Sequence, residues 1–454
     1  LFTYGLRDFA GLKIEKLWKD PESYQVVRLD FSRIKPNGSF EEFQAYCEDY
    51  LSTQFQKIGF RRNQKNIFSN QLDFFISRLP DSSLVVLIDE YDAPLTACLD
   101  KPELFRSIRN YFSTFYSIFK ANDAALRFLF ITGITKFNKT SIFSELNNLT
   151  DISLLSGYGA LLGYTHQEVE KYFYDYLSYA SQKLQISREE LSDRLTENYD
   201  GFCFEETAKQ RVFSPWSLLM FLTYPERGFK DYWFESGGKP SVLLKYFKSH
   251  SLRNPEEYGK EKTLALSSLS SSSDIENLSD VGLLTQAGYL TIKAVKYGDT
   301  VFVGYPNKEV KKAIAQLYVE QLLNGRIAGQ VGAGPIVEVL SEEGAESVFH
   351  ILNRLFHAID YSRYPVKDEA SVRAFVQVYF SGAGLDPVIE HHTAHGRTDL
   401  EVKAGTRHWI FEFKVARPDE SAKIKLSEAL EQIKSRNYGA DSTYCEVRRI
   451  ALVL

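Results

Sequence analysis

Residues 396–414 (GRTDLEVKAGTRHWIFEFK) contain two runs that favour β-structure, separated by a short turn. The runs are Thr398–Val402 and His408–Ala416, and the turn is Gly405-Thr406. Glycine at the first central position suits a type II′ turn, so the stretch predicts a β-hairpin with a two-residue loop. Such a loop pairs Ala404 with Arg407 and fixes the register of all the residues behind them.

This register brings three charged side chains to one face of the hairpin. Asp399 falls opposite Glu412, and the period of two along a strand puts Lys414 on the same side as Glu412. Two carboxylates directly across a ladder repel each other. A divalent cation and a neighbouring ammonium group compensate for such repulsion, so the spacing predicts a metal-dependent hydrolytic site.

Length and composition indicate two or three globular domains with well-filled cores. The chain has 454 residues, of which 44% are hydrophobic and 14% aromatic. Its formal net charge is −5, so nucleic-acid binding requires a local basic patch. Residues 403–454 hold ten Lys and Arg against seven Asp and Glu, and this surplus of three fits either a basic patch or ordinary solvated helix faces.

Cysteine spacing and hydropathy bear on the compartment. The four cysteines form no Cys-x-x-Cys pair, which argues against a zinc module or a disulfide scaffold and suits a reducing compartment. No run approaches the roughly 18 apolar residues of a membrane span, and no signal peptide opens the chain. We therefore expect a cytoplasmic protein with no membrane partner. A first residue other than Met, and an apolar run at the last residues, suggest trimming at both ends.

The first region has the pattern of a parallel α/β domain. Apolar runs with little alternation are typical of strands buried on both faces, and three occur here: Tyr24–Phe31, Leu84–Glu90 and Leu126–Thr132. Phe40–Phe55 and Pro102–Phe119 between them show helical spacing of apolar residues.

The second run ends in Asp89-Glu90, at the edge where α/β sheets bind their ligands. These two acids fit a Walker B site, in which Asp89 binds Mg²⁺ through water and Glu90 polarises the attacking water. The other interpretation is that they cap the following turn.

Longer motifs extend over nearly the whole chain in a fixed order. They are VVLIDEYDAPL (85–95), FLFITGITKFNKTSIFSELNNLTDISL (128–154), LLGYTHQEVEKYF (161–173), NYDGFCF (198–204), VFSPWSLL (212–219), DYWFESGG (231–238), LLTQAGYLTIK (283–293) and GYPNKEV (304–310). With the hairpin, they resemble the AAA-ATPase-like proteins of bacteria that carry a C-terminal PD-(D/E)XK nuclease domain.

The resemblance implies an α/β multidomain fold. Residues 1–164 correspond to a P-loop, AAA-like parallel sheet core, residues 165–344 to a helical lid and a winged-helix-like connector, and residues 345–454 to a restriction-endonuclease-like α/β domain. Asp280–Leu323 has the order helix, hairpin, helix, which fits a winged helix against DNA or a plain connector. The lysines consistent with DNA contact are Lys293, Lys296, Lys308, Lys311 and Lys312.

The resemblance also assigns roles in the hairpin. Asp399 and Glu412 correspond to the residues that bind Mg²⁺ or Mn²⁺, although Thr398 replaces the proline that opens the family motif. Lys414 corresponds to the residue that orients or helps deprotonate the attacking water.

Two further positions come from the flanking helices. Glu369, in a helix expected over Lys367–Phe380, corresponds to the family's helix glutamate. Gln432, in a helix expected over Ser421–Arg436, corresponds to a polar residue that contacts the site. Glu390 is a further candidate or a solvated acid.

The chain departs from the family in one respect. No GxxxxGK[ST] Walker A segment occurs in the sequence, and the glycine-rich run 329–334 lacks the lysine and the hydroxyl. Without that segment Asp89 and Glu90 have no phosphate to act on, so ATP is expected as a cofactor only where the segment is present. A missing first strand also predicts a gap in the parallel sheet.

A histidine cluster competes for the same region. His391, His392 and His395 beside Glu390 resemble a zinc site, because zinc accepts nitrogen ligands. Adjacent residues on a strand point to opposite faces, however, and a polar loop is the other interpretation.

Two functions remain open at this point. The first is a Mg²⁺-dependent nuclease, acting on DNA in preference to RNA and coupled to an AAA-like nucleotide-binding domain, in defence or mobile-element biology. The second is a nucleic-acid-binding scaffold or regulator that does not cut. AAA-like domains often assemble as homo-oligomeric rings, although no arginine here can be singled out for such an interface.

Overall fold

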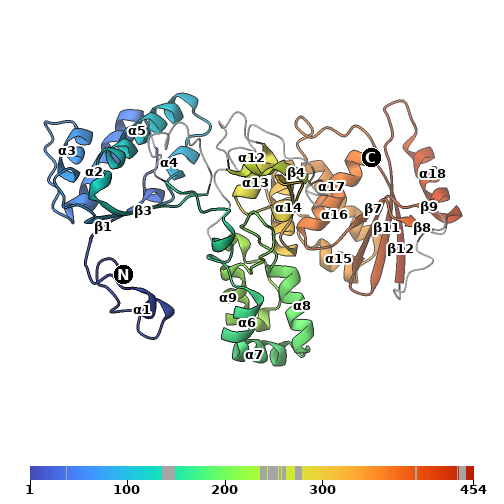
Figure 1. Ribbon diagram of the computed structural model, residues 1–454. Helices are drawn as coiled ribbons and strands as arrows, with labels where there is room; N and C mark the ends of the chain where they lie inside the picture. Colours follow the sequence, from blue (N-terminus) through green and yellow to red (C-terminus); the bar gives the residue numbers. More distant parts are fainter. Residues whose placement is uncertain are drawn as a thin grey trace.

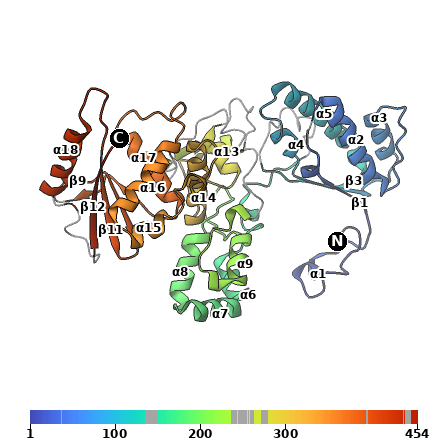
Figure 2. The same ribbon diagram turned by 180° about the vertical axis from the view of Figure 1, so that it is seen from behind.

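A computed structural model describes residues 1–36, 38–134, 149–235, 243, 254, 257, 262–270, 279–393, 396–436, 438 and 446–454. An N-terminal α/β unit lies at one end of the molecule and a C-terminal α/β domain at the other (Figure 1). A lobe of four helices projects from the region between them, and the view from behind shows the same order (Figure 2).

The N-terminal unit is a parallel sheet with helices on one face. Strands β1 (Gln25–Asp30), β2 (Leu84–Asp89) and β3 (Leu126–Ile131) pair in the order β1-β2-β3. Helices α2 (Phe40–Gln56), α3 (Phe68–Ile76) and α5 (Pro102–Ala121) share one hydrophobic core with the sheet (Figure 1). The short helices are α1 (Lys13–Leu17) and α4 (Ala93–Thr96).

Two expectations for this sheet are wrong. The three described strands pair directly with one another, so no gap lies between them. Burial on both faces also fails for β3, since Phe128 is 39% exposed and Phe130 37% exposed. The reason is that the described helices α2, α3 and α5 pack on the opposite face, while Phe2 stacks on Phe128 with ring centroids 5.4 Å apart.

The helical lobe is built from four helices. It contains α6 (His166–Tyr172), α7 (Tyr174–Leu184), α8 (Arg188–Tyr199) and α9 (Pro215–Thr223). Thr165 and Glu168 form a capping box that starts α6. Leu177, Leu195 and Phe221 belong to the core that holds the four helices together.

The middle region contains a small antiparallel sheet. Strands β4 (Lys262–Ala265), β5 (Thr291–Lys296) and β6 (Thr300–Gly304) pair in the order β4-β6-β5. Helices α12 (Leu266–Ser270) and α13 (Asp280–Gln286) lie between β4 and β5 in the chain, and α14 (Lys308–Leu322) follows β6.

The C-terminal domain is built on a mixed sheet. Strands β7 (Val388–Ile389), β10 (Leu400–Ala404), β11 (Arg407–Lys414) and β12 (Glu446–Val453) pair in the order β12-β11-β10-β7, with β12 parallel to β11. The helices are α15 (Ile336–Glu342), α16 (Ala345–Ala358), α17 (Glu369–Gly382) and α18 (Ala422–Ser435). A separate two-residue ladder joins β8 (His392–Thr393) to β9 (Gly396–Arg397).

Alternation along the strands explains which helices pack on which face. Leu400, Trp409 and Phe411 belong to the large core that also contains residues of α15, α16 and α17. Ile410, one residue out of phase, packs with Ile433 of α18 on the other face. The acids of the hairpin therefore share the face of the sheet that α18 covers.

The large core runs from the middle region into the C-terminal domain without a break. It contains Ile314 of α14 and Val376 of α17 as well as the sheet residues. The indole Nε1 of Trp409 donates to the carbonyl of Leu340 in α15 at 2.8 Å. Elements on both sides of residue 344 thus pack on the same sheet, and the division at 344/345 stays a prediction.

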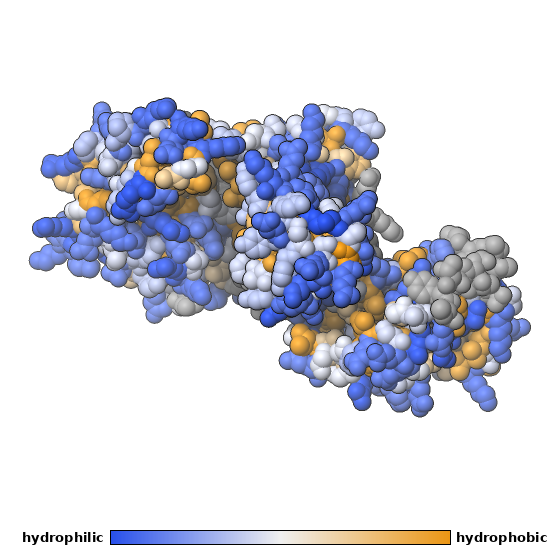
Figure 3. Space-filling model, turned by 90° about the horizontal axis from the view of Figure 1, so that it is seen from below, coloured by the Kyte–Doolittle hydropathy of each residue, from blue (hydrophilic) through white to orange (hydrophobic). Residues whose placement is uncertain are grey.

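Among the helices that the structure describes, none has the length and apolar character needed to cross a membrane. The face of the molecule seen in Figure 3 is mainly hydrophilic, and its hydrophobic side chains lie in small, separate groups.

Candidate functional site

The β10–β11 hairpin has the register predicted from the sequence. Ala404 pairs with Arg407 and Lys403 with His408. Gly405 has φ +57°, and Thr406 is not among the residues with positive φ, which is the pattern of a type II′ turn. The turn prediction is therefore confirmed.

Asp399 lies immediately before β10 and is oriented by the backbone of the next strand. Its Oδ2 accepts a hydrogen bond from the N–H of Phe413 at 2.9 Å. Its Oδ1 lies 3.6 Å from Nη1 of Arg373. The carboxylate is thus fixed by one oxygen, while the other faces charged groups.

Glu412 is a buried acid, and only one of its two carboxylate oxygens has a partner among the described residues. The residue is 1% exposed, and its Oε1 lies 3.3 Å from Nζ of Lys414. Its Oε2 has no hydrogen-bond partner among the residues that the structure describes. Burial, and then the nearby charge of Asp399, raise the pKa of Glu412 to about 7. A bound cation would satisfy the free oxygen and relieve the repulsion.

Lys414 connects the hairpin to the start of α17. Its Nζ lies 3.7 Å from Oε1 of Glu369 in addition to its contact with Glu412. Glu369 is the first residue of α17, after Asp368, whose side chain accepts from the N–H of Ser371. The helix start thus delivers Glu369 to the same lysine.

Gln432 reaches the site only through another side chain. Its Nε2 donates to the hydroxyl of Tyr438 at 3.4 Å, and that hydroxyl donates to the carbonyl of Arg397 at 2.7 Å. Arg397 precedes Asp399 by two residues, so Gln432 and Tyr438 support the segment that enters the site.

The donor set suits magnesium better than zinc. In the described part of the chain no three His, Cys, Asp or Glu side chains converge to hold a metal ion. Mg²⁺ is usually held by one or two carboxylates together with water and substrate phosphate. Asp399 and Glu412 can supply the two carboxylates.

The histidine cluster is described only in part. His391 is engaged with Glu401, with Nδ1 3.3 Å from Oε1. The side chain of His392 and the whole of His395 lie outside the described residues. A zinc site made of the three histidines stays a hypothesis.

Arg373, which no sequence motif marked, joins two acids of the site. Its Nη2 lies 2.9 Å from Oε1 of Glu390, and its Nη1 reaches Asp399. Its spacing in the sequence could have identified it. Arg373 lies four positions after Glu369, and residues four apart lie on the same face of a helix.

Glu401 is a second buried acid that was not identified. It is 7% exposed and accepts from Thr398 at 2.8 Å, while its Oε2 lies 3.1 Å from Nε2 of His408. Burial by itself would raise the pKa of Glu401, but hydrogen bonds with His408, Thr398 and His391 hold it at about 2. This cluster lies two residues along β10 from Asp399 and stabilises the hairpin.

The predicted nucleotide-binding acids lie at the carboxyl edge of the parallel sheet. Oδ1 of Asp89 accepts from Thr132 at 2.7 Å, across from β2 to the end of β3. Glu90 has φ +50°, and burial followed by the charges of Asp89, Asp30 and Asp92 raises its pKa. A cavity of about 220 Å³ beside Asp89 is lined by Arg28, Leu87, Ile88, Phe130 and Thr132 as well.

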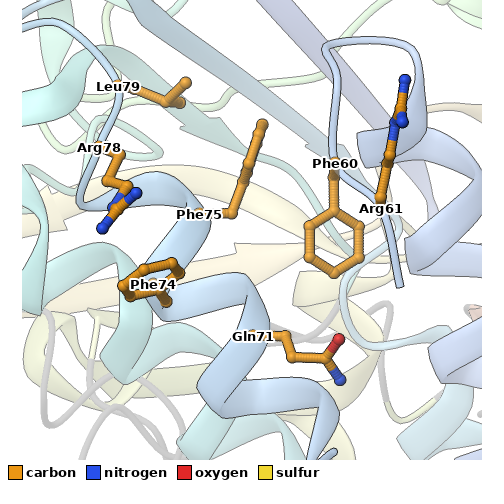
Figure 4. Close-up of a pocket in the computed structure, with 7 residues that line it drawn as sticks. All are labelled: Phe60, Arg61, Gln71, Phe74, Phe75, Arg78 and Leu79. Carbon is orange, nitrogen blue, oxygen red and sulfur yellow. The ribbon is translucent and has the colours of Figure 1, made fainter. Parts of the chain in front are cut away.

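A larger cavity, of about 310 Å³, lies on α3, away from both groups of acids. Figure 4 shows its lining: Phe60, Arg61, Gln71, Phe74, Phe75, Arg78 and Leu79. It contains no carboxylate, and the amide of Gln71 is bonded to the 63–67 segment. Its size therefore does not mark it as the site of the chemistry.

Most of the lysines considered for DNA contact are engaged within the protein. Lys308 lies 2.9 Å from Glu197, and Lys312 lies 2.5 Å from Asp231. Lys293 donates to the carbonyl of Pro306, and burial lowers its pKa. Lys296 lies over the ring of Phe302, 4.7 Å from its centroid.

Comparison with known proteins identifies two regions of the chain. Residues 6–143 match the AAA-ATPase-like family, described as a predicted AAA-ATPase. Residues 367–454 match the PD-(D/E)XK nuclease superfamily.

A relative similar over nearly the whole chain is an uncharacterized protein in the vnfD 5′ region of Azotobacter chroococcum mcd 1. It is 29% identical over 439 residues, which cover 95% of this chain and 80% of the relative. No solved structure matches the chain.

The two matched regions coincide with the two groups of acids described above. The chain thus carries an AAA-ATPase-like domain in its first third and a PD-(D/E)XK nuclease-superfamily domain at its C-terminal end.

Proposed function

We propose that the protein is a Mg²⁺-dependent nuclease that hydrolyses phosphodiester bonds, with DNA as the preferred substrate. The observation that carries the proposal is the free, buried Oε2 of Glu412 beside Asp399 and Lys414. A buried carboxylate oxygen without a partner is costly, and sites that bind ligands are where such costs are retained.

Each residue of the site has its own role in this proposal. Asp399 and Glu412 would hold Mg²⁺ or Mn²⁺, which when bound polarises the phosphate and lowers the pKa of a water. Lys414 orients the attacking water or takes part in removing its proton. Glu369 holds the Lys414 ammonium group from the α17 side, and Gln432 supports the entering segment through Tyr438.

The experiment is a cleavage assay with purified protein, supercoiled DNA and Mg²⁺ or Mn²⁺. We expect nicking by the parent chain and loss of nicking in Glu412→Ala and Lys414→Ala. If both variants cut as well as the parent protein, the assignment is wrong. Single-stranded and duplex RNA in the same assay test the preference for DNA.

We also propose that an N-terminal domain that includes a Gly-Lys-Ser/Thr segment binds a nucleotide with the help of Asp89 and Glu90 and thereby regulates the nuclease. The cavity beside Asp89 supports this, as does the cluster of acids at the carboxyl edge of the sheet. Because the sequence lacks a Gly-Lys-Ser/Thr segment, calorimetry on this chain should detect no ATP binding. A chain that includes such a segment should bind ATP, and Asp89→Asn should remove the Mg²⁺ dependence of that binding.

The alternative is a nucleic-acid-binding regulator that does not cut. It predicts DNA binding with no cleavage under any divalent cation. The burial of Glu412 against Lys414, with Asp399 close enough to raise the pKa of Glu412, favours the enzyme. Binding alone does not need a buried acid whose second oxygen lacks a partner among the described residues. The nuclease proposal has three further parts. They are a role in defence or mobile-element biology, a cytoplasmic location and assembly of copies of the chain.

A further inference from the structure

Arg373 is the cation that contacts Asp399, the first of the two proposed metal ligands. It lies one helical turn after Glu369, its side chain is 14% exposed, and its Nη2 lies 2.9 Å from Oε1 of Glu390. Its Nη1 lies 3.6 Å from Oδ1 of Asp399. A guanidinium keeps its charge even at this low exposure, so a positive charge always faces this carboxylate.

Glu390 gathers two arginines at the solvent side of the site. Besides Arg373, its Oε2 lies 3.5 Å from Nη1 of Arg397. Its φ of +50° lies in the left-handed region, which residues other than glycine rarely adopt. The side chain of Glu390 is 39% exposed and that of Arg397 is 51% exposed, so an anion from solvent approaches the two arginines from the Arg397 side.

The net charge of the site is such that one divalent metal ion and one phosphodiester together bring it to zero. The charged residues around the hairpin form two contact groups. One contains Asp399, Arg373, Glu390 and Arg397, and the other contains Glu412, Lys414 and Glu369. With Glu412 ionised, four negative and three positive charges leave −1. A divalent cation changes this to +1, and the single charge of a phosphodiester brings it to zero.

Only one oxygen of Asp399 is available to a cation without competition from the backbone. Oδ2 already accepts from Phe413, whereas Oδ1 faces Arg373. A cation at Oδ1 therefore lies close to the guanidinium, and like charges a few ångströms apart in a partly buried site oppose each other strongly. A phosphate oxygen placed against Arg373 relieves that repulsion and gives the guanidinium its preferred planar partner.

We infer that Arg373 makes metal binding and phosphodiester binding cooperative. With no phosphodiester, Arg373 opposes a divalent cation at Asp399. A bound phosphodiester pairs with Arg373 and frees Asp399 for the metal, so each ligand raises the affinity for the other by the same factor. This inference rests on the proposed function, but it concerns binding and does not require turnover.

The test uses the 454-residue chain and Arg373→Gln, which removes the charge but keeps a polar side chain of similar length. Mn²⁺ affinity is measured by calorimetry without nucleic acid. We expect Arg373→Gln to bind Mn²⁺ about ten-fold more tightly than the parent protein, because a nearby like charge is gone. Arg373→Lys keeps the charge and should bind Mn²⁺ like the parent.

The second measurement is the affinity for a 20-base-pair DNA duplex, with EDTA and then with Ca²⁺. Ca²⁺ should raise the affinity of the parent protein about ten-fold and that of Arg373→Gln less than two-fold, since the coupling factor is shared by both ligands. Arg448→Gln is the matched control, because Arg448 belongs to the same domain and pairs with Glu446 on β12. It should behave like the parent protein in both measurements.

The outcomes separate this inference from the proposed function. If Arg373→Gln binds Mn²⁺ no more tightly than the parent protein while Glu412→Gln binds it more weakly, Arg373 does not couple the ligands and the metal site stands. If Glu412→Gln binds Mn²⁺ like the parent protein, the proposed metal site itself fails, and the inference fails with it.

Discussion

Lys414 lies between two acids from different elements, with its Nζ 3.3 Å from Oε1 of Glu412 and 3.7 Å from Oε1 of Glu369. One ammonium group thus connects the buried strand β11 to the exposed start of α17. The position of this ammonium group depends on both elements. Its positive charge offsets the two negative charges, which would otherwise repel a substrate phosphate.

Glu412→Gln should abolish cleavage and raise the stability of the C-terminal domain. The amide cannot hold a divalent cation as a carboxylate does, so we expect at least about a hundred-fold loss of nicking. It also removes the like charge beside Asp399, so the unfolding temperature should rise. The cleavage assay and a thermal melt check the two expectations, with Lys403→Met, on the neighbouring strand, as a control that keeps its activity. A fall in both activity and stability would indicate a purely structural role for Glu412.

Tyr438→Phe should reduce cleavage about ten-fold. Its hydroxyl accepts from Gln432 and Arg436 and donates to the carbonyl of Arg397, and losing each hydrogen bond of this kind costs about 1 kcal/mol of stability. Tyr361→Phe is a matched control, since that hydroxyl also donates to a backbone carbonyl, of Phe356. Urea unfolding should show a larger loss of stability in Tyr438→Phe, because that hydroxyl is buried with three partners, and only Tyr438→Phe should lose activity. Equal activity in the two variants would contradict the support role of Tyr438.

Glu309→Gln should flatten the pH dependence of stability in the middle region. Glu309 is 2% exposed, accepts from Ser217 at 2.8 Å, and burial raises its pKa from 4.5 to about 7. Since the folded protein holds this proton more tightly than the unfolded chain, the stabilisation is complete below about pH 4.5. It is then lost as the pH rises to about 7.

At roughly 1.4 kcal/mol for each pKa unit, this loss amounts to about 3 kcal/mol. Urea unfolding at several values between pH 5 and pH 8 measures it in both proteins. The parent protein should become less stable relative to Glu309→Gln as the pH rises. Parallel curves would show that Glu309 does not titrate in this range.

Lys308→Ala and Lys312→Ala should leave DNA affinity within about two-fold of the parent value. Lys308 is paired with Glu197 and Lys312 with Asp231, so neither is expected to neutralise a phosphate. The measurement is the dependence of DNA affinity on salt concentration, whose slope falls by about one for each lost phosphate contact. A shallower slope in either variant would instead support a winged helix that holds DNA through this face.

The parts of the structure that follow local periodicity were predictable. Alternation and the Gly405 turn predicted the hairpin, and apolar spacing predicted α2, α5 and α17 within a few residues of their observed bounds. The exposure of Phe128 and Phe130 was not predictable, because an apolar run looks the same whether one or both faces are covered.

The sequence by itself determined the β10–β11 register, and with it the common face of Asp399, Glu412 and Lys414, because a two-residue loop and a period of two leave no other arrangement. Only the tertiary structure decided which groups surround them. The packing of α17 brings Arg373 to Asp399, and Tyr438 lies between Gln432 and the carbonyl of Arg397. Such contacts join residues far apart in the chain, and their distances depend on how helices pack on a sheet, which no local pattern records.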